Sequence, residues 1–392
     1  MSEPHASDVP RPHSFYEFFA GGGMVRAGLG ARWQCLFAND FDHKKGRIYR
    51  DNWGEDELKS ADVGTLKTSE LPGTASLAWA SFPCQDLSLA GGGAGLKGDR
   101  SGTFWPFWKL MKGLVAENRG PQLIVLENVC GTLTSHGGKD FATICTAVQQ
   151  ADYVMGGVVV DASLFLPQSR PRLFVVAVRR DVQLPQDVMA DGPTAPWHTP
   201  ALKTAYENLP AKVRKDWVWW NLSLPPQRKV KFADIIEENP VSPTWFTPEE
   251  TKKLLAMMSP INRAKVQDAK TQGRRIVGGV YKRTRPDVDG RKVQRAEVRF
   301  DDVAGCLRTP AGGSSRQVVV VVEGKAVKAR LISSRETARL MGLPDSYKLP
   351  ENYNEAYHLT GDGVVVPVVR HLAEHILEPI LRNGKPGATI AA

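Results

Sequence analysis

Hydrophobic and polar positions form a repeating pattern through the first 180 residues. Short apolar runs with few polar interruptions recur there, which is typical of strands buried on both faces of a sheet. We predict strands at residues 14–19, 34–38, 76–82, 122–127, 153–160 and 172–178. Apolar residues spaced three or four apart predict helices at 24–29, 102–117 and 140–150. The alternation predicts an α/β fold with a doubly wound, mostly parallel sheet covered by helices on both sides.

The pattern changes after residue 179. Residues 185–300 contain many prolines, five tryptophans and no clear hydrophobic period, so we interpret this stretch as a second, smaller, irregular domain. Order returns with a strand at 317–322, a helix at 333–341 and an amphipathic helix at about 368–381. Ser333 and Glu336 have capping-box spacing. These closing elements are too few to bury a core alone, so we expect them to rejoin the first domain.

The predicted organisation is therefore discontinuous. We expect a loose tail over residues 1–13, a first domain over 14–184, the smaller domain over 185–302, and a return to the first domain over 303–392. No apolar run approaches the roughly 20 residues of a membrane span, and no secretory signal precedes the first strand. The five cysteines are scattered without a CxxC pair, so we expect neither a disulfide framework nor a metal site, and a cytoplasmic location.

Charge is concentrated in one segment. The whole chain carries a net charge of +9, while residues 261–300 alone hold twelve basic side chains against four acidic ones. Such a segment within a balanced protein indicates a polyanion-binding surface, and a solvated surface loop is the alternative.

A glycine-rich turn follows the first predicted strand. Residues 19–23 read Phe-Ala-Gly-Gly-Gly and lead directly into a helix. Glycines let a ligand approach the backbone, and a helix start offers free N–H groups, although many such turns only join a strand to a helix. Asp40 ends the second strand, where an acid can accept hydrogen bonds from ribose hydroxyls. Phe41 could pack on an adenine ring, and Asp62 could accept from an exocyclic amine.

Three further segments carry candidate chemistry. The strand at 76–82 leads into Pro83-Cys84-Gln85 and a loop rich in glycine, where a thiolate can act as a nucleophile; a buried core cysteine is the alternative. Glu127 ends another apolar strand, and burial would raise its pKa toward neutrality. Arg170 and Arg172 precede the next strand two residues apart, so they could point to one side and bind a phosphate or ring oxygen, or else form surface salt bridges.

In order, these motifs resemble those of DNA (cytosine-5) methyltransferases. The matching segments are Phe-x-Gly-x-Gly at 19–23, Pro-Cys-Gln at 83–85, Glu-Asn-Val at 127–129, Gln-x-Arg-x-Arg at 168–172 and Glu-x-x-Arg-Leu-x-Gly-x-Pro-Asp-x-Tyr at 336–347. Each motif is modest alone, but together and in this order they are very specific. The resemblance covers about residues 14–180 and 303–382.

The resemblance implies roles for the catalytic candidates. Cys84 would add to C6 of a flipped-out cytosine, and Glu127 would contact N3 and the exocyclic amine. Arg172, with Arg170 nearby, would support the O2 side and hold Glu127 in place. Gln85 and Asn128 would support the geometry of the Pro-Cys loop.

The resemblance also implies S-adenosylmethionine as the methyl donor. The residues implied to bind it are Phe19, Gly21, Gly23, Asp40, Phe41, Asp62, Val63, Pro83, Phe104 and Asp362. The family motif that would contain Asp362 usually reads Gly-Asn-Ser/Ala-Val, whereas this chain has Gly361-Asp362-Gly363-Val364. This departure puts cofactor affinity rather than activity in question.

The smaller domain corresponds to the family's target-recognition domain for double-stranded DNA. Its candidate DNA contacts are Arg274, Arg275, Arg283 and Arg285. We expect a monomer associated with the nucleoid, and a partner restriction endonuclease is left open. The alternatives are a tRNA cytosine-5 methyltransferase of the same fold and a non-catalytic DNA-binding relative.

Overall fold

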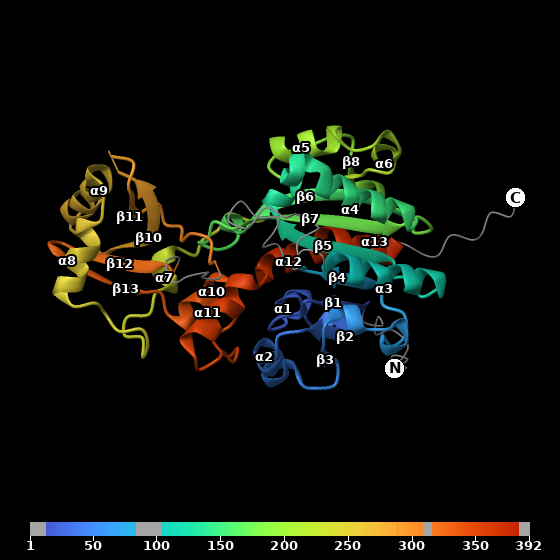
Figure 1. The fold of residues 1–392 in the computed structure, drawn as a ribbon, viewed down its shortest axis with the longest axis horizontal. Helices are drawn as coiled ribbons and strands as arrows, with labels where there is room; N and C mark the ends of the chain where they lie inside the picture. The colour runs from blue at the N-terminus through green and yellow to red at the C-terminus, as the bar shows by residue number, and fades with distance from the viewer. Residues whose placement is uncertain (1–12, 84–102, 288, 309–315, 384–392) are drawn as a thin grey trace, which may run out of the picture. The chain divides into compact units, whose positions relative to one another are not determined.

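The computed structural model describes residues 13–83, 103–287, 289–308 and 316–383. The chain divides into two compact units (Figure 1). The larger unit comprises Met1–Val160, Arg172–Ser223 and Val369–Ala392, and the smaller unit comprises Asp161–Pro171 and Leu224–Val368.

A seven-stranded sheet forms the centre of the larger unit within the described residues, in the order β3-β2-β1-β4-β5-β7-β6. The strands are β1 (His13–Phe18), β2 (Trp33–Asp40), β3 (Leu58–Ser60), β4 (Leu77–Ala80), β5 (Leu123–Val129), β6 (Tyr153–Asp161) and β7 (Pro171–Arg179). Neighbours from β3 to β5 pair in parallel, and β7 runs antiparallel to β5. The six predicted strands of this region are confirmed, while the three-residue β3 was too short to be predicted.

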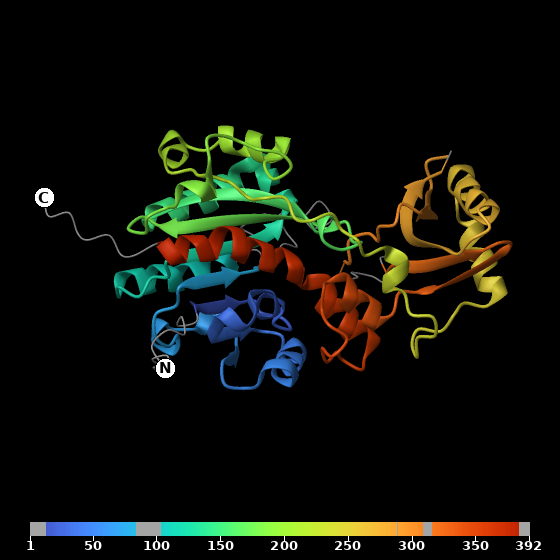
Figure 2. The same cartoon turned by 180° about the vertical axis from the view of Figure 1, so that it is seen from behind.

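Helices cover both faces of this sheet, as predicted. The helices are α1 (Met24–Leu29), α2 (His43–Trp53), α3 (Phe104–Ala116) and α4 (Lys139–Gln150). Figures 1 and 2, seen from opposite sides, place α3 and α4 on one face and α13 (Glu378–Asn383) on the other. The first face is dense with side chains such as Phe107, Met111 and Phe141, which have no exposed surface.

The helical segment at the end of the described chain is longer than predicted. It consists of α12 (Val366–Leu372), a π-helical turn at Ala373–Leu377 and α13. Trp33 at the start of β2 donates its indole N–H to a Glu378 oxygen at 3.1 Å. Glu374 accepts from Arg32 at 3.1 Å, so the segment is tied to the beginning of the chain.

The compact units divide at other positions than composition suggested. Residues Arg172–Ser223 belong to the larger unit, and beyond β7 they form β8 (Met189–Ala190), α5 (Pro200–Glu207), α6 (Ala211–Lys215) and β9 (Trp219–Trp220). Trp197 is buried there, and its carbonyl accepts from the Val159 N–H of β6 at 2.8 Å. Tryptophans that we assigned to the smaller domain therefore pack in the larger one.

The smaller unit is an antiparallel sheet rather than an irregular domain. Its described strands lie in the order β11-β10-β12-β13. They are β10 (Ile276–Pro286), β11 (Lys292–Arg299), β12 (Val318–Glu323) and β13 (Ala326–Leu331). The helices of the unit are α7 (Phe232–Ile235), α8 (Pro248–Ala256), α9 (Pro260–Thr271), α10 (Ser334–Leu340) and α11 (Tyr353–Asp362). One sheet face forms a core with α8 and α9.

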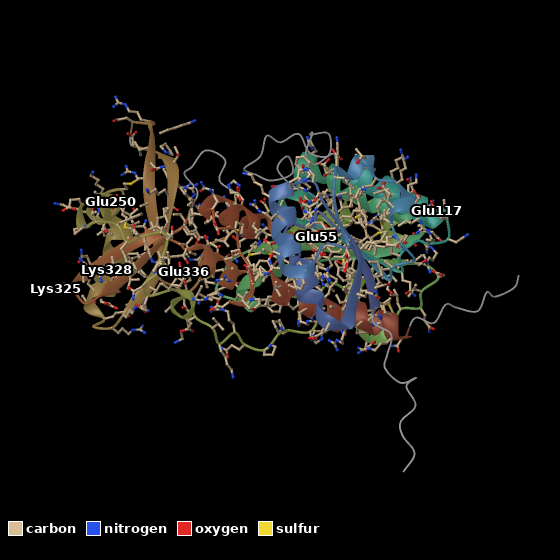
Figure 3. The ribbon with its side chains drawn as sticks, turned by 90° about the horizontal axis from the view of Figure 1, so that it is seen from below. Glu55, Glu117, Glu250, Lys325, Lys328 and Glu336 are labelled. Carbon is tan, nitrogen blue, oxygen red and sulfur yellow. The ribbon has the colours of Figure 1, made fainter. Side chains whose placement is uncertain are left out.

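Segments on both sides of residue 303 build this sheet. Val280 of β10 pairs with Val318 of β12, so the elements from β12 to α11 lie in the smaller unit, and only residues from Val369 on lie in the larger one. Exposed charged side chains cover its outer surface, including Glu250 on α8 and Lys325 and Lys328 on the β12–β13 hairpin (Figure 3).

Candidate functional site

Several of the predicted site residues lie at one edge of the large sheet. The carboxyl ends of the parallel strands β1, β2, β4 and β5 meet at this edge, which is where ligands bind in open α/β sheets. Because β7 is antiparallel, its first residues lie at the same edge, and Arg172 pairs with Val129 at the end of β5. The sheet topology therefore brings the arginine of one motif beside the glutamate of another.

The glycine turn after β1 has an unusual backbone. Phe19 adopts a φ of 58°, which is uncommon for a residue with a side chain, and Gly21 and Gly23 have φ values of 56° and 78°. The Ala20 N–H donates to the Asn39 carbonyl at 2.9 Å, which fixes the turn against β2. A Cβ added at Gly21 would meet no atom within 4 Å, so the backbone of this turn borders open space that a ligand could enter.

Asp40 supports the glycine turn directly. Its Oδ2 accepts from the Gly21 N–H at 2.7 Å, and its Oδ1 accepts from the Asp42 N–H at 2.8 Å. The side chain is buried, and burial raises its pKa above the usual range, against the favourable charge of Lys45. Each carboxylate oxygen retains a second lone pair, so the residue can hold the turn and still accept from a ligand hydroxyl.

Other predicted cofactor residues follow strands β2, β3 and β4 in the sequence. Phe41 is 73% exposed, which is unusual for a phenyl ring and leaves its face available for stacking. The Asp62 side chain caps a short helical turn by accepting from the Gly64 N–H at 2.7 Å, and Val63 is buried behind it. Phe104, at the start of α3, is fully buried against Phe82.

Glu127 and Arg172 form the ion pair at the end of β5. Arg172 Nε lies 3.3 Å from Glu127 Oε1, and the two side chains are 16% and 8% exposed. The ion pair therefore holds the Glu127 carboxyl in a fixed orientation at the end of β5.

Asn128 connects β5 to the segment that carries the predicted nucleophile. Its amide donates to the Phe82 carbonyl at 3.2 Å, and its Oδ1 accepts from the Val129 N–H and from the Thr132 hydroxyl. The backbone immediately before Pro83 is thereby anchored to the strand that ends in Glu127. The predicted nucleophile Cys84 and its neighbour Gln85 lie outside the described residues.

Arg170 binds backbone oxygens of the smaller unit. Its guanidinium donates to the carbonyls of Leu307, Gly361 and Gly363 at 2.7 to 2.9 Å, and the side chain is 2% exposed. Arg170 and Arg172 thus have different partners, although they are two residues apart. The carbonyls of Gly361 and Gly363 flank Asp362, which is exposed at the end of α11. Arg170 therefore fixes the turn in which this chain departs from the family motif.

The candidate DNA contacts lie on or beside β10. Arg274 is exposed before the strand, and Arg275 forms ion pairs with Glu238 and Glu323 at 2.9 and 3.3 Å. Arg283 and Arg285 occupy one face of the β10–β11 hairpin, about half exposed, on either side of Glu297 at 3.4 and 2.9 Å. Their Nε atoms face the carboxylate.

Sequence reasoning did not single out Trp53. Its indole N–H donates to the Gly22 carbonyl at 2.9 Å, and so it contacts the predicted cofactor turn directly. The available sequence signal was its spacing of one helical turn from Tyr49, which is typical of ordinary packing.

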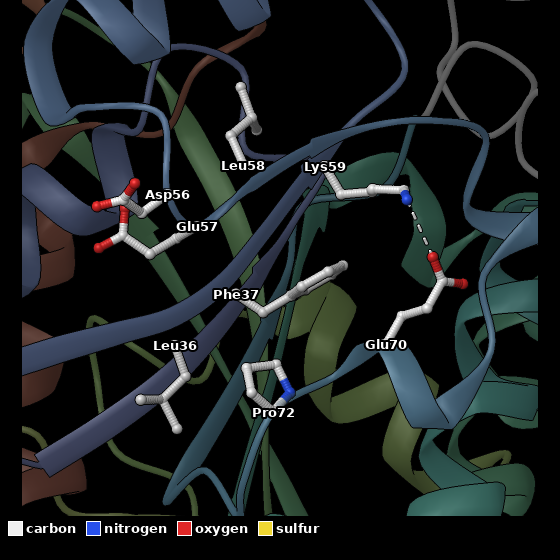
Figure 4. A pocket seen from close by; sticks show the side chains of 8 residues that line it. All are labelled: Leu36, Phe37, Asp56, Glu57, Leu58, Lys59, Glu70 and Pro72. Carbon is white, nitrogen blue, oxygen red and sulfur yellow. Dashed lines mark ion pairs between the residues drawn. The ribbon is translucent and has the colours of Figure 1, made fainter.

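A shallow depression lies elsewhere on the larger unit. Its volume is about 350 Å³, and it lies beside β2 and β3 (Figure 4). Three of its four charged lining residues form ion pairs, because Lys59 contacts Glu70 at 3.1 Å and Glu57 contacts Arg26 at 3.1 Å. The lining residues are Leu36, Phe37, Asp56, Glu57, Leu58, Lys59, Glu70 and Pro72. None of them was a predicted site residue.

The described residues contain neither a candidate metal site nor a candidate membrane-spanning helix. No cluster of three or more His, Cys, Asp or Glu side chains in the described ranges could hold a metal ion. No helix among those ranges is both long and apolar enough to cross a bilayer.

The described part of the larger unit has a doubly wound α/β fold. A solved structure of Schizosaccharomyces pombe Dnmt2 methyltransferase shares this fold, with a TM-score of 0.58 and 17% identity over 94% of this chain and 99% of that one. The model of the family described as C-5 cytosine-specific DNA methylase matches residues 13–378, and the chain belongs to that family.

Curated relatives agree with this assignment. The type II methyltransferase M.HhaI of Haemophilus parahaemolyticus is 24% identical, covering 92% of this chain and 93% of that protein. The type II methyltransferase M.BsuFI of Bacillus subtilis is 23% identical, covering 94% of this chain and 73% of that protein. The chain is accordingly a DNA (cytosine-5) methyltransferase.

Proposed function

We propose that this enzyme methylates a cytosine turned out of duplex DNA, and that Cys84 forms a transient covalent bond to C6 of that base. The observation that carries the proposal is the buried Glu127–Arg172 pair at the sheet edge. Asn128 links the strand that carries this pair to the Phe82 backbone, which precedes Pro83 and Cys84 in the sequence.

The chemistry follows from the weakness of C5 as a nucleophile. Addition of the Cys84 thiolate to C6, with a proton supplied to N3 by Glu127, turns C5 into an enamine carbon. The bound donor would supply an electrophilic methyl group to C5. Loss of the C5 proton to a base expels Cys84 by β-elimination, and return of the N3 proton to Glu127 restores the neutral ring. Arg172 holds the Glu127 carboxyl in place and offers N–H groups to the O2 side.

The glycine turn and its neighbours fit a nucleoside-containing donor. Open space beside Gly21, the exposed Phe41 ring and the carboxyls of Asp40 and Asp62 offer backbone access, a stacking face and acceptors. S-adenosylmethionine would supply the activated methyl group. Phe19, Gly23, Val63, Pro83 and Phe104 would line the same site, as the family resemblance implies. The resemblance also implies a donor role for Asp362, which lies in the turn whose carbonyls Arg170 binds.

Arg170 and Arg172 have different roles in this proposal. Arg172 acts at the base, whereas Arg170 is a positioning residue, because its N–H groups already bind carbonyl oxygens. Replacing Arg170 would therefore act through the Gly361–Gly363 turn and not through contact with cytosine.

The smaller unit is proposed to recognise the target sequence in DNA. Its basic β10–β11 hairpin presents Arg283 and Arg285 at its surface, with Arg274 and Arg275 beside it. Phosphate neutralisation by such side chains makes affinity fall steeply as salt rises. The relatives named type II methyltransferases favour membership of a restriction–modification system with a cognate endonuclease.

Trapping on DNA that contains 5-fluorocytosine tests the covalent step. Fluorine at C5 cannot leave as a proton does, so the wild type should accumulate a denaturation-resistant adduct in the presence of the donor. Cys84→Ala should form none and should transfer no methyl group, while the matched variant Cys130→Ala should behave as wild type. Cys130 is a suitable control because it is partly buried next to the Glu-Asn-Val motif.

The same experiment separates the alternatives. Full methylation of duplex DNA by Cys84→Ala would exclude the proposed mechanism. Transfer of labelled methyl groups to tRNA in place of duplex DNA would favour the tRNA alternative. Absence of both adduct and transfer in the wild type would favour the non-catalytic relative.

A further inference from the structure

The glycine turn is held on its second side by helix α2. On the β2 side, Asn39 and Asp40 fix the backbone of Ala20 and Gly21. On the other side, Trp53 at the end of α2 donates its indole N–H to the Gly22 carbonyl at 2.9 Å. The peptide between Gly22 and Gly23 is thus held from two directions, by the Trp53 indole at its carbonyl and by the Gly23 N–H, which donates to the Ala20 carbonyl at 2.8 Å.

The fit between Trp53 and the turn is close. A Cβ at Gly23 would lie 2.4 Å from Trp53 Nε1 and 2.9 Å from Tyr49 Cε2, so a side chain at residue 23 and an indole at residue 53 exclude each other. Gly23 also has a φ of 78°, which a substituted residue would adopt only with strain.

Trp53 is itself held by a charged side chain. The Arg26 guanidinium lies over the Trp53 ring at 5.3 Å and over the Tyr49 ring at 5.9 Å. Glu57 accepts from both terminal nitrogens of Arg26 at 3.1 and 3.3 Å, and the Tyr49 hydroxyl accepts at 3.1 Å. Arg26 belongs to α1, the helix that the turn introduces, so α1, α2 and the turn form one clamp.

We propose that Trp53 is a positioning residue for the methyl donor: its N–H holds the Gly22 carbonyl and so keeps the turn in its ligand-receiving conformation. This inference rests on the proposed donor role of the glycine turn. Trp53 contacts the Gly22 carbonyl of the turn and is not among the residues proposed to take part in the reaction. Replacing it should therefore change donor affinity and leave the methyl-transfer step unchanged.

Trp53→Phe separates the hydrogen bond from the packing. The phenyl ring fills most of the same space but donates nothing to Gly22, so the loss of one hydrogen bond should raise the dissociation constant for S-adenosylhomocysteine about fivefold in calorimetry. The KM for S-adenosylmethionine should rise similarly, while kcat at saturating donor and the affinity for duplex DNA stay unchanged.

Trp33→Phe is the matched control. Trp33 also lies in the larger unit and loses an indole hydrogen bond, to Glu378, but it has no contact with the turn. Its donor affinity should equal that of the wild type even if its melting temperature falls. Glu57→Gln is a second variant, which leaves Trp53 intact and loosens Arg26; it should raise the dissociation constant less, about twofold.

The outcomes are distinguishable. Unchanged donor affinity in both folded Trp53→Phe and Glu57→Gln would overturn the inference while leaving the proposed function intact. A fall in kcat without a change in donor affinity would overturn it as well. Failure of the wild type to bind S-adenosylhomocysteine would overturn the proposed function itself.

Discussion

Both units bury a glutamate completely, and they do so in opposite ways. Glu336 in the smaller unit receives hydrogen bonds from Arg330 at 2.8 Å and from the Ser333 and Glu237 N–H groups at 2.7 Å each. Arg330 is equally buried and lies over the Trp245 ring at 4.8 Å. Glu336 therefore joins β13, α10 and the segment before α8.

Glu17 in the larger unit has no such arrangement. It is fully buried in β1, and neither carboxyl oxygen makes a hydrogen bond of ordinary geometry to a described residue, although Arg26 lies near. Burial raises its pKa to about 8, against the opposing charge of Arg26. Equal burial therefore has different results: the Glu336 carboxyl is hydrogen-bonded to three segments of its unit, whereas the Glu17 carboxyl has a pKa of about 8.

Removing the buried Arg330 cation should have the largest effect on stability. Arg330→Met leaves Glu336 buried without its counter-charge, which should lower the free energy of unfolding of that unit by about 3–5 kcal/mol in urea titrations. Replacing both residues by methionine should recover much of that loss. Arg274→Met, at an exposed position, should change stability little, and a similarly small loss in Arg330→Met would contradict the comparison.

Glu17→Gln should have a smaller effect that depends on pH. The folded-state pKa of about 8 lies above the ordinary value of 4.5, so the folded wild type holds an extra proton between these values and loses stability as the pH rises across that window. The slope can reach about 1.4 kcal/mol per pH unit. Cys35, whose pKa burial raises to about 12, does not titrate there.

Chemical denaturation at several pH values between about 5 and 9 measures this slope. The variant Glu17→Gln should show a flatter stability profile than the wild type, because the amide has no proton to lose. Glu55→Gln, on the surface of the same unit (Figure 3), serves as the control and should retain the wild-type slope. Parallel profiles for Glu17→Gln and the wild type would show that Glu17 is ionised in the folded protein.

The smallest effect on stability should come from an exposed carboxylate with two arginine neighbours. Glu297→Gln removes the anion between Arg283 and Arg285, yet all three side chains contact solvent, so unfolding should shift by less than about 1 kcal/mol. The same change should tighten binding of duplex DNA at low salt, because the arginines lose an internal competitor for phosphate. Weaker binding by Glu297→Gln would indicate that the carboxylate aligns the arginines.

The predictable parts of the fold are those with a simple burial pattern. Strands β4 and β5 are buried along nearly their whole length, and their apolar runs identified them. The capping box of Ser333 and Glu336 is confirmed at the start of α10. The hairpin of β10 and β11 escaped prediction because its outer half, including Arg283 and Arg285, is exposed and so shows no hydrophobic alternation.

The site shows the same limits. Its glycine turn and strand-end acid could be predicted because local sequence specifies them. The pairing of Glu127 with Arg172 was implied by the family resemblance, but no local pattern reveals the antiparallel direction of β7 on which it depends. Likewise, nothing in the spacing of Arg170 indicated that its guanidinium binds carbonyls about 190 residues further along the chain.

The hydrogen bond between Trp33 and Glu378 has a consequence for biosynthesis. The two residues are 345 positions apart, so a ribosome needs about 20 to 70 seconds to make the partner of Trp33. During that interval, the part of the sheet face that α13 later covers lacks this helix. A nascent or truncated chain that stops before Glu378 should therefore expose apolar surface to chaperones and proteases.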